Sequence, residues 1–488
     1  MPFPFELPTT SSVSFTDHYT STTHPSLPLA ATTARGVLRD VLKKHKRLPP
    51  PSQTSNLPAV TSAVTDYLPY LTALDAGLRD NRDATDPQNH PHVTPTTQDL
   101  AVEWRATLTP SPVPGRPAPR LQQRGLGAEQ AFALSTLGFA HALGARAALH
   151  ALQATTTSPT PEQRAAAVAA AMRAFLDAHA VHAFVAGRPS APGAAVDVSP
   201  GVQAALAELA LAEATLVAVL KDDPYPGVVA EDRARGGTEW MWRAPEIPKV
   251  RAHLFARLCL AAAEHAARGA AGLGKARVEE GLGRYLEDLR RTARGKACRF
   301  LGIDAELAGR TGEGIAWLRA ARRELGFGGG AGAAGAGGVE EEKKKGFASR
   351  LKKDWAEKRE DRKIEKGADW GSDAGRFEEG RVVEMLEKKW VKMNDTVGVQ
   401  PIPPVEPLLA NLPSGREYHT PKPYRLPTLD ASTVTRMRAP PDPSDPGFAG
   451  NEDDSADEDE RLASSSHTGP AGAFPGTAAD YGGDRNYY

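Results

Sequence analysis

The sequence predicts a mainly α protein built as a stack of helices, with a small β element near its N-terminus and a disordered C-terminal tail. The first observation is an Ala-rich block over 126–325, whose helical segments carry apolar residues on more than one face. Such helices are covered from two sides, as in layered helix stacks. The second is apolar alternation, which in 1–20 is typical of short strands or extended edge segments and in 101–108 of a strand. The third is a polar, acidic and Gly-rich composition after about residue 438, which is typical of disorder.

The composition narrows the class of protein further. At 488 residues the chain is long enough for several ordinary domains or one extended helical array. Its net charge of −1 offers no global attraction to nucleic acid or acidic lipid. Two cysteines, Cys259 and Cys298, cannot form a disulfide framework, so the chain fits a reducing cytosol and packing is expected for both.

Targeting and membrane signals are absent from the sequence pattern. The N-terminus has no basic segment followed by an apolar run, so no signal peptide is expected. The most apolar stretch, 204–220, is short for a membrane span and carries Glu208 and Glu213. We therefore expect a soluble, cytoplasmic protein.

The N-terminal elements follow from apolar spacing and from proline. Residues 30–45 carry apolar side chains on one helical stripe, and the three prolines at 49–51 are expected to stop this helix. A second helix is expected over 57–80, where apolar residues again recur at helical spacing. Residues 81–100 are polar with three prolines and predict a loop, and the alternation in 101–108 predicts a strand.

The Ala-rich block divides into at least four helices. Its second helix begins at Thr160 and Pro161, which suit the N-cap and first-turn positions. Its third helix begins at Ser199 and stops at the run Asp222-Asp223-Pro224. The expected helices cover 126–153, 160–186, 199–220 and about 248–272, with one or two more over 279–325.

Beyond the block, Gly-rich and charged segments follow. Residues 326–338 read as a low-complexity linker, part of an insertion over 326–345. The charged stretch at 340–366 holds both signs in near balance, which favours a solvated helix or tether. A further helix is expected over 377–393.

The C-terminal part is rich in proline and then polar. Two PxxP elements at 401–407 could serve as polyproline ligands, although interleaved apolar residues favour a segment that runs along the domain surface. Whether Tyr424–Leu429 is a docking peptide or a surface strap stays open. We expect one helical domain over 1–425 and a disordered acidic, Gly-rich tail over 426–488.

Three patterns resemble ligand sites but favour ordinary structure. Residues 330–335 match the dinucleotide fingerprint formally, but that motif needs a preceding strand and here a helix precedes it. His179 and His182 could share a helix face, yet zinc needs a third ligand and none is suggested nearby. The pair Asp222–Asp223 runs into proline and reads as a helix stop. We expect no catalytic residue, no cofactor and no metal.

The order of several segments resembles one known family. Four segments carry the resemblance: PFELPTTSSVSFTD near the N-terminus, VEWRATL before the first long helix, DVSPGVQAALAELALAEAT in the block and KKWVKMNDTVGVQPIPPVEPL at its close. Their order resembles that in the Bro-one domain of ESCRT-associated adaptors such as Alix. The chain is most similar to fungal members that signal ambient pH. The resemblance covers roughly 1–425. It implies a curved helical array with a tetratricopeptide-like centre and a small sheet near the N-terminus.

The resemblance also implies a function. It is that of a non-enzymatic adaptor in fungal ambient (alkaline) pH signalling. The expected partner is the C-terminal amphipathic helix of the Snf-seven type ESCRT-III subunit, and the expected outcome is proteolytic activation of a pH-responsive transcription factor. Other proteins of the pH-signalling complex are further expected partners, and nucleic acid is not. The protein would be cytoplasmic and recruited to plasma-membrane or endosomal ESCRT sites through its partners.

The family's apolar docking patch maps onto three leucines of this chain. Leu216 falls where the family has an aromatic residue after its LAxAE run, and Leu254 and Leu258 fall on the two apolar positions of the following helix. Residues 224–247 resemble an insertion that could alter one edge of the groove. The helical period independently places Leu254 and Leu258 on one stripe with Ala261, Ala262 and His265, bordered by Arg257, Glu264 and Arg268.

Three alternatives stay open at the level of sequence. The three leucines could all be core residues. The chain could be an endosomal, multivesicular-body cargo-sorting adaptor of the same fold. It could also be a helical enzyme with a buried polar site, which would need convergent carboxylates or histidines inside the array, and none has a suitable spacing.

Overall fold

The computed structural model describes most of the chain, in two units. The described residues are 2–79, 91–111, 117–152, 160–189, 193–228, 249–274, 276–327 and 370–439. The larger unit is Met1–Met437 and the smaller one is Arg438–Tyr488. Every described helix and strand lies in the larger unit.

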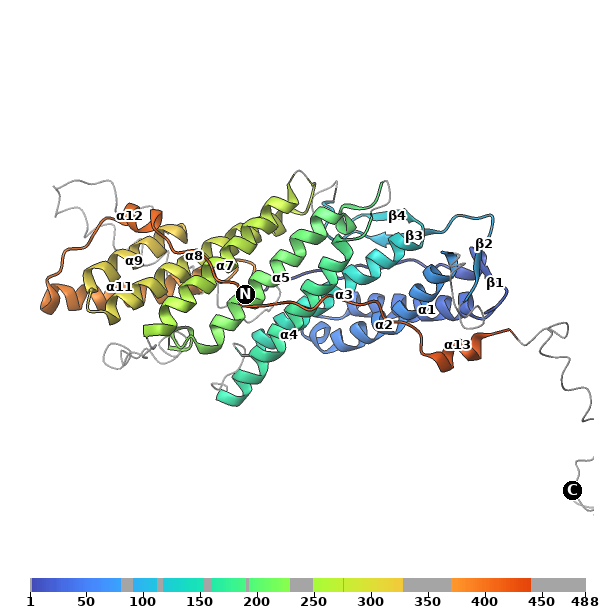
Figure 1. Ribbon diagram of the computed structural model, residues 1–488, viewed down its shortest axis with the longest axis horizontal. Coiled ribbons are helices and arrows are strands. Elements are labelled where there is room, and N and C mark those ends of the chain that lie inside the picture. Colours follow the sequence, from blue (N-terminus) through green and yellow to red (C-terminus); the bar gives the residue numbers. More distant parts are fainter. Residues whose placement is uncertain are drawn as a thin grey trace, which may run out of the picture. The chain divides into compact units, whose positions relative to one another are not determined.

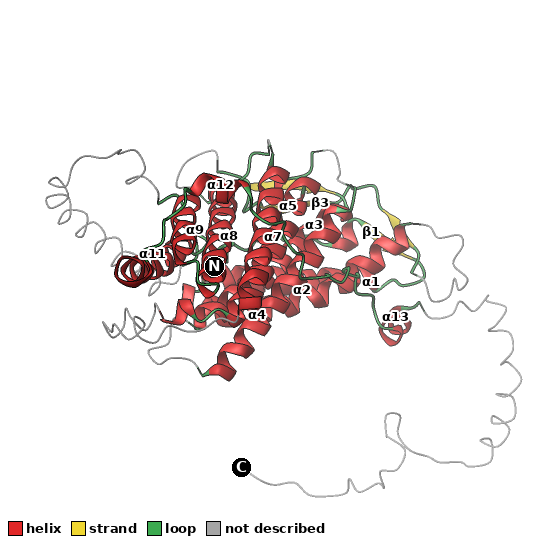
Figure 2. Cartoon of the chain, turned by 60° about the vertical axis from the view of Figure 1, so that its left-hand side comes forward, coloured by secondary structure: helices red, strands yellow, loops and turns green. Residues whose placement is uncertain are grey.

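The larger unit is mainly α, as the sequence predicts (Figures 1 and 2). Its long helices are α1 (Leu27–Arg47), α2 (Pro50–Leu78), α3 (Leu126–Ala151), α4 (Pro161–Ala186), α5 (Pro200–Asp222), α7 (Lys249–Leu273), α8 (Glu280–Leu307), α9 (Thr311–Glu324) and α11 (Arg376–Met393). Shorter pieces are the 3-10 helices η1 (Phe15–Asp17) and η2 (Val196–Val198), the π-helical turn η4 (Asn394–Gly398), α12 (Val405–Ala410) and α13 (Ala431–Met437).

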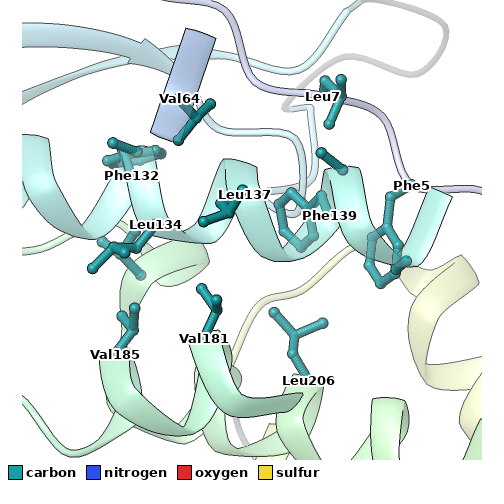
Figure 3. Close-up of a cluster of buried hydrophobic side chains, with 14 of the residues drawn as sticks. Phe5, Leu7, Val64, Phe132, Leu134, Leu137, Phe139, Val181, Val185 and Leu206 are labelled. Atoms are coloured by element: carbon teal, nitrogen blue, oxygen red, sulfur yellow. The ribbon is translucent and has the colours of Figure 1, made fainter. Parts of the chain in front are cut away.

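Consecutive long helices pack on one another from α1 to α9, and α11 closes on α8 and α9. Figure 3 shows how α3 is covered on both sides: its Phe132, Leu134, Leu137 and Phe139 lie between α4 and the N-terminal segment. One core cluster spans the N-terminal elements through α5 and continues into the C-terminal part of α7 and the N-terminal part of α8. A second spans the end of α5, the rest of α7 and α8, and α9 and α11. This two-sided burial is the physical reason why the helices are apolar on more than one face.

The β element consists of two small antiparallel pairs. β1 (Tyr19–Ser21) pairs with β2 (Val93–Pro95), and β3 (Ala101–Arg105) pairs with β4 (Arg120–Arg124). Residues before Tyr19 run mostly without ladder pairing, apart from a bridge between Thr10 and Trp104. The alternation in 1–20 therefore gives extended edge segments more than strands.

Trp104 fixes β3 to the helices through a buried polar cluster. Its Nε1 donates to Glu129 of α3 over 2.6 Å, and Tyr67 of α2 donates to the same carboxylate over 2.9 Å. Arg35 of α1 pairs with Glu129 at 2.8 Å, and the Glu129 side chain is fully buried. One carboxylate thus ties β3 and three helices together.

The prolines at 49–51 follow the end of the first helix, as expected, but they also open the next one. α1 ends at Arg47, as a proline stop would require, but Pro50 opens α2 instead of preceding a loop. Proline suits the first helical position because its missing N–H has no intrahelical partner there. The predicted start of the second helix at 57 was therefore wrong by two turns. The predicted Thr160 cap is confirmed: Thr160 and Gln163 form a reciprocal capping box.

Three helices, α3, α4 and α5, are long and apolar enough to cross a membrane by length and composition alone. The expectation that the 204–220 region is too short was therefore wrong, because α5 extends beyond it at both ends. In the structure, 67% of the apolar window of α3, 39% of that of α4 and 78% of that of α5 is buried within the protein. Packing inside the helix stack accounts for the apolar character of α3 and α5, whereas less than half of the apolar window of α4 is buried.

Candidate functional site

Leu216 lies where three helices meet. It is partly exposed and sits on α5, which is otherwise buried on most sides. Its side chain packs against both large core clusters and against Ala262, Ala263 and Ala293 of α7 and α8.

Leu216 also lines a cavity of about 630 Å³, solvent at its mouth included. The walls come from α3, α4, α5, α8 and the start of α11, and the apolar lining includes Leu149, Phe175, Leu216, Leu220 and Leu289. The lining of this cleft is mostly apolar, with a few polar groups.

Three polar side chains of this cavity matter chemically. Burial raises the pKa of Glu213 to about 7, although Tyr285 donates to its carboxylate over 2.5 Å. Burial likewise raises the pKa of Glu378. The Thr292 hydroxyl is buried and has no hydrogen-bond partner in the described part of the chain. The cavity therefore presents carboxyl groups that hold protons more tightly than usual.

Leu254 and Leu258 lie one turn apart on α7 but differ in exposure. Leu254 is partly exposed and packs against the second core cluster. Leu258 is only 3% exposed and belongs to that cluster. The structure thus places Leu216 and Leu254 at accessible positions and Leu258 beneath the surface.

A returning segment covers the C-terminal part of the predicted stripe of α7, from Arg257 to His265. We call residues 411–429 the C-terminal strap; it crosses the helices toward α13 (Figures 1 and 2). The Arg416 N–H donates to the Arg257 carbonyl over 3.0 Å, and the Arg257 guanidinium donates to the Ser414 carbonyl over 3.1 Å. A Cβ on Gly415 would lie 2.8 Å from the backbone nitrogen of Ala261, so only glycine allows this close approach.

Charged groups of α5, α7 and the strap converge at His265. Its Nδ1 lies 2.8 Å from Glu208 of α5 and its Nε2 lies 2.9 Å from Glu417 of the strap. Arg268 also donates to Glu208 over 2.9 Å. Burial acts to raise the pKa of Glu208, but the hydrogen bonds from His265 and Arg268 outweigh it and hold this pKa below its usual value. The bordering charges of the predicted groove are thus engaged within the chain.

The rest of the C-terminal segment also runs along the surface, as the interleaved apolar residues indicate. Side chains between Ile402 and Leu412 pack against the second core cluster. Tyr424 makes an edge contact with Phe184 of α4, with ring centroids 5.5 Å apart, and Leu426 and Leu429 pack against the first cluster. The segment 424–429 is therefore a surface strap.

A buried ionic cluster at the end of α5 was missed by the sequence analysis. Asp222 ends α5, as predicted, but Asp223 then pairs with Arg299 of α8 at 2.6 Å. Arg299 also pairs with Glu379 of α11 at 2.5 Å, and Lys296 pairs with the same carboxylate. Because these groups lie far apart in sequence, the only signal available was the isolated acidic pair.

The other candidate ligands have ordinary partners. His179 and His182 each contact α5, at the Ala207 carbonyl and the Gln203 side chain. Cys259 and Cys298 are buried free thiols, and burial raises the pKa of each to about 12. Within the described ranges, no group of three His, Cys, Asp or Glu side chains could hold a metal ion.

Several predicted features lie outside the described residues. They are most of the 326–345 insertion, including the 330–335 fingerprint, the 340–366 charged stretch, the part of the 224–247 insertion that holds Trp240 and Trp242, and the tail beyond 439.

Comparison with solved structures identifies the fold. The chain is similar to a structure described as the ALIX BRO1 CHMP4C complex, with a TM-score of 0.50 and 14% identity, over 88% of this chain and 98% of that one. At this identity the likeness shows the fold, which is that of a Bro-one domain. No protein-family model matches the chain.

Comparison with known sequences gives the family. The chain is 45% identical to the pH-response regulator protein palC of Emericella nidulans over 518 aligned positions, which cover 100% of both chains. It is also 34% identical to a palC protein of Cryptococcus neoformans over 146 residues, 29% of this chain and 26% of that one. The chain belongs to the palC family of pH-response regulators, whose members are regulatory proteins by name.

Proposed function

We propose that this protein is a non-enzymatic adaptor in fungal ambient-pH signalling. It binds the C-terminal amphipathic helix of the Snf-seven type ESCRT-III subunit on the face formed by α5 and α7. Binding recruits the machinery that activates a pH-responsive transcription factor by proteolysis. The adaptor acts from the cytoplasm at plasma-membrane or endosomal ESCRT sites, where its partners hold it.

The observation that carries the proposal is the accessible leucine pair on neighbouring helices. Leu216 and Leu254 are partly exposed, and Arg251, one turn before Leu254, pairs with Asp222 at 3.5 Å. Apolar anchors beside charged groups suit an amphipathic helix. The fold supports the same partner class, because the similar solved structure names an ESCRT-III protein in its description.

In the proposed site Leu258 lies beneath Leu254 and supports it, since the Leu258 side chain is only 3% exposed. Burying two partly exposed leucines contributes on the order of 2–4 kcal/mol before the costs of association. Charged contacts at the rim add to this binding free energy, and the loss of motional freedom on association opposes it. We therefore expect a dissociation constant in the micromolar range.

The test uses the full chain and a fluorescent peptide of the partner's C-terminal helix, read by anisotropy. Leu254→Asp and Leu216→Asp should each weaken binding at least about tenfold, because a carboxylate at an apolar contact must be desolvated. Leu29→Asp is the matched control, since Leu29 is 59% exposed on α1, away from this face. Circular dichroism and a melting curve establish that each variant is folded. Binding that survives both changes in folded protein removes the proposed site.

A further inference from the structure

The turn between α1 and α2 carries a concentrated positive charge. Lys43, Lys44, Lys46 and Arg47 occupy the end of α1, and no acidic residue occurs between Asp40 and Asp66. Lys44, Lys46 and Arg47 are exposed. The turn joins the first two helices of the stack, and α1 packs on α2 and short N-terminal elements (Figure 1).

Neighbouring strands place two further arginines near this turn, each beside a carboxylate. Burial lowers the pKa of Lys46, and the positive charges of Arg105 and Arg120 lower it further, which places cations of β3 and β4 within electrostatic reach of the turn. Each of these arginines has an acidic neighbour: Glu6 pairs with Arg105 at 2.6 Å, and Glu103 lies 3.9 Å from Arg120. Asp40 pairs with Arg39 at 2.8 Å. The excess positive charge is therefore that of the basic residues at the end of α1 itself.

Exposed apolar side chains continue the same face of α1. Leu29 is 59% exposed and Val37 is 54% exposed, two of the most exposed large apolar side chains in the described residues. At a helical spacing of three or four residues, Leu29, Thr33, Val37, Asp40, Lys44 and Arg47 share one side of the helix. The outer side of α1 is thus apolar toward its start and basic toward its end.

Stabilisation of the helix accounts for only part of this pattern. Basic side chains in the last turn interact favourably with the carbonyl end of a helix, within about one turn. That effect does not require Leu29 and Val37 to be exposed on the same helix. A surface that combines basic groups with accessible apolar groups is typical of proteins that lie on anionic bilayers.

We propose that the outer side of α1 and the α1–α2 turn form a docking surface for an anionic lipid bilayer. Lys44 and Arg47, on the same side of α1 as Val37 and Leu29, contact lipid headgroups, and Val37 and Leu29 reach the boundary of the acyl region. Lys46 points to another side of the helix and adds attraction from the turn without that contact. The surface lies on elements other than the α5–α7 face, so a membrane contact here leaves that face free for a protein partner.

Vesicle co-sedimentation of the full chain tests this surface. Vesicles of phosphatidylcholine containing phosphatidylserine should capture the protein, and pure phosphatidylcholine should not. Capture should fall as salt rises, since the contact is largely electrostatic. The triple variant Lys44→Glu, Lys46→Glu, Arg47→Glu should lose at least about 100-fold in affinity, because each basic residue near an anionic surface contributes about fivefold.

The matched control changes the same number of charges elsewhere. Arg284→Glu, Arg310→Glu and Arg323→Glu alter three arginines whose side chains are 69%, 56% and 57% exposed on other elements. Capture retained by this control and lost in the test variant supports the proposal. Equal loss in both variants overturns it, as does equal capture on neutral vesicles. Soluble polyglutamate that binds the turn while vesicles do not would assign the surface to an acidic protein instead.

Discussion

Arg299 of α8 and Glu379 of α11 form an ion pair at 2.5 Å in which neither side chain is exposed to solvent. Burial alone lowers the pKa of Arg299, but Asp223 and Glu379 outweigh it and keep the guanidinium charged. Asp223 connects the end of α5 to the same group. The cluster therefore joins three helices that are distant in sequence.

Removing the shared cation should destabilise the fold severely. Arg299→Met leaves Asp223 buried without its cationic partner and leaves Glu379 with Lys296 alone, and breaking a buried pair in this way costs about 3–5 kcal/mol. The free energy of unfolding, measured with urea, should fall by that amount. Arg319→Met is the control, because Arg319 pairs with Glu387 while 46% exposed. Similar losses for both variants would contradict a special role for the buried cluster.

Glu213 should give the fold a pH dependence at neutral pH. Its pKa is about 7 in the folded protein against an ordinary 4.5, so the folded state binds its proton more tightly than the unfolded state. The stability it contributes is present below pH 4.5 and is lost as pH rises toward and through 7, a change on the order of 3 kcal/mol. Glu213→Gln should therefore gain stability relative to the natural protein as pH rises from 5 toward 8. A constant difference across this range would show that Glu213 does not titrate there.

His182 should have the opposite dependence. Burial lowers its pKa to about 4, so the unfolded state, with a pKa near 6.5, binds the proton more tightly. Its contribution is present above pH 6.5 and is lost as pH falls toward and through 4. His182→Gln should flatten the acid side of the stability curve, measured by urea unfolding at several pH values. His253→Gln, at an exposed position of α7, should leave the curve unchanged.

The sequence predicted helix boundaries well where they depend on residues that are close together in the chain. α4 begins at its Thr160 cap and ends at Ala186, as the pattern indicates, because capping and apolar spacing act within a few residues. The start of α2 was wrong because Pro50 can either end one helix or open the next, and only packing of the following turn decides between them.

The candidate site shows the same limit. The helical period correctly places Leu254 and Leu258 on adjacent turns of α7. It contains no information on the strap, which arrives from more than 150 residues further along the chain and bonds to Arg257. Partners of Arg299 are likewise set by tertiary packing. Periodicity therefore predicts which residues share a face, whereas the chain's later segments decide whether that face is open.

Closure of the strap on α7 depends on Gly415. Its position leaves no room for a Cβ, which would lie within 2.9 Å of both the backbone nitrogen and the Cα of Ala261. Gly415→Val should force the strap off α7 locally, at a cost of about 1–3 kcal/mol for overpacking. Hydrogen exchange should then show loss of protection at the Arg416 amide, which otherwise donates to the Arg257 carbonyl. Ser414→Val is the control, because Ser414 is exposed and adjacent. Protection of the Arg416 amide that persists in Gly415→Val would mean that α7 shifts to accept the side chain and the strap stays in place.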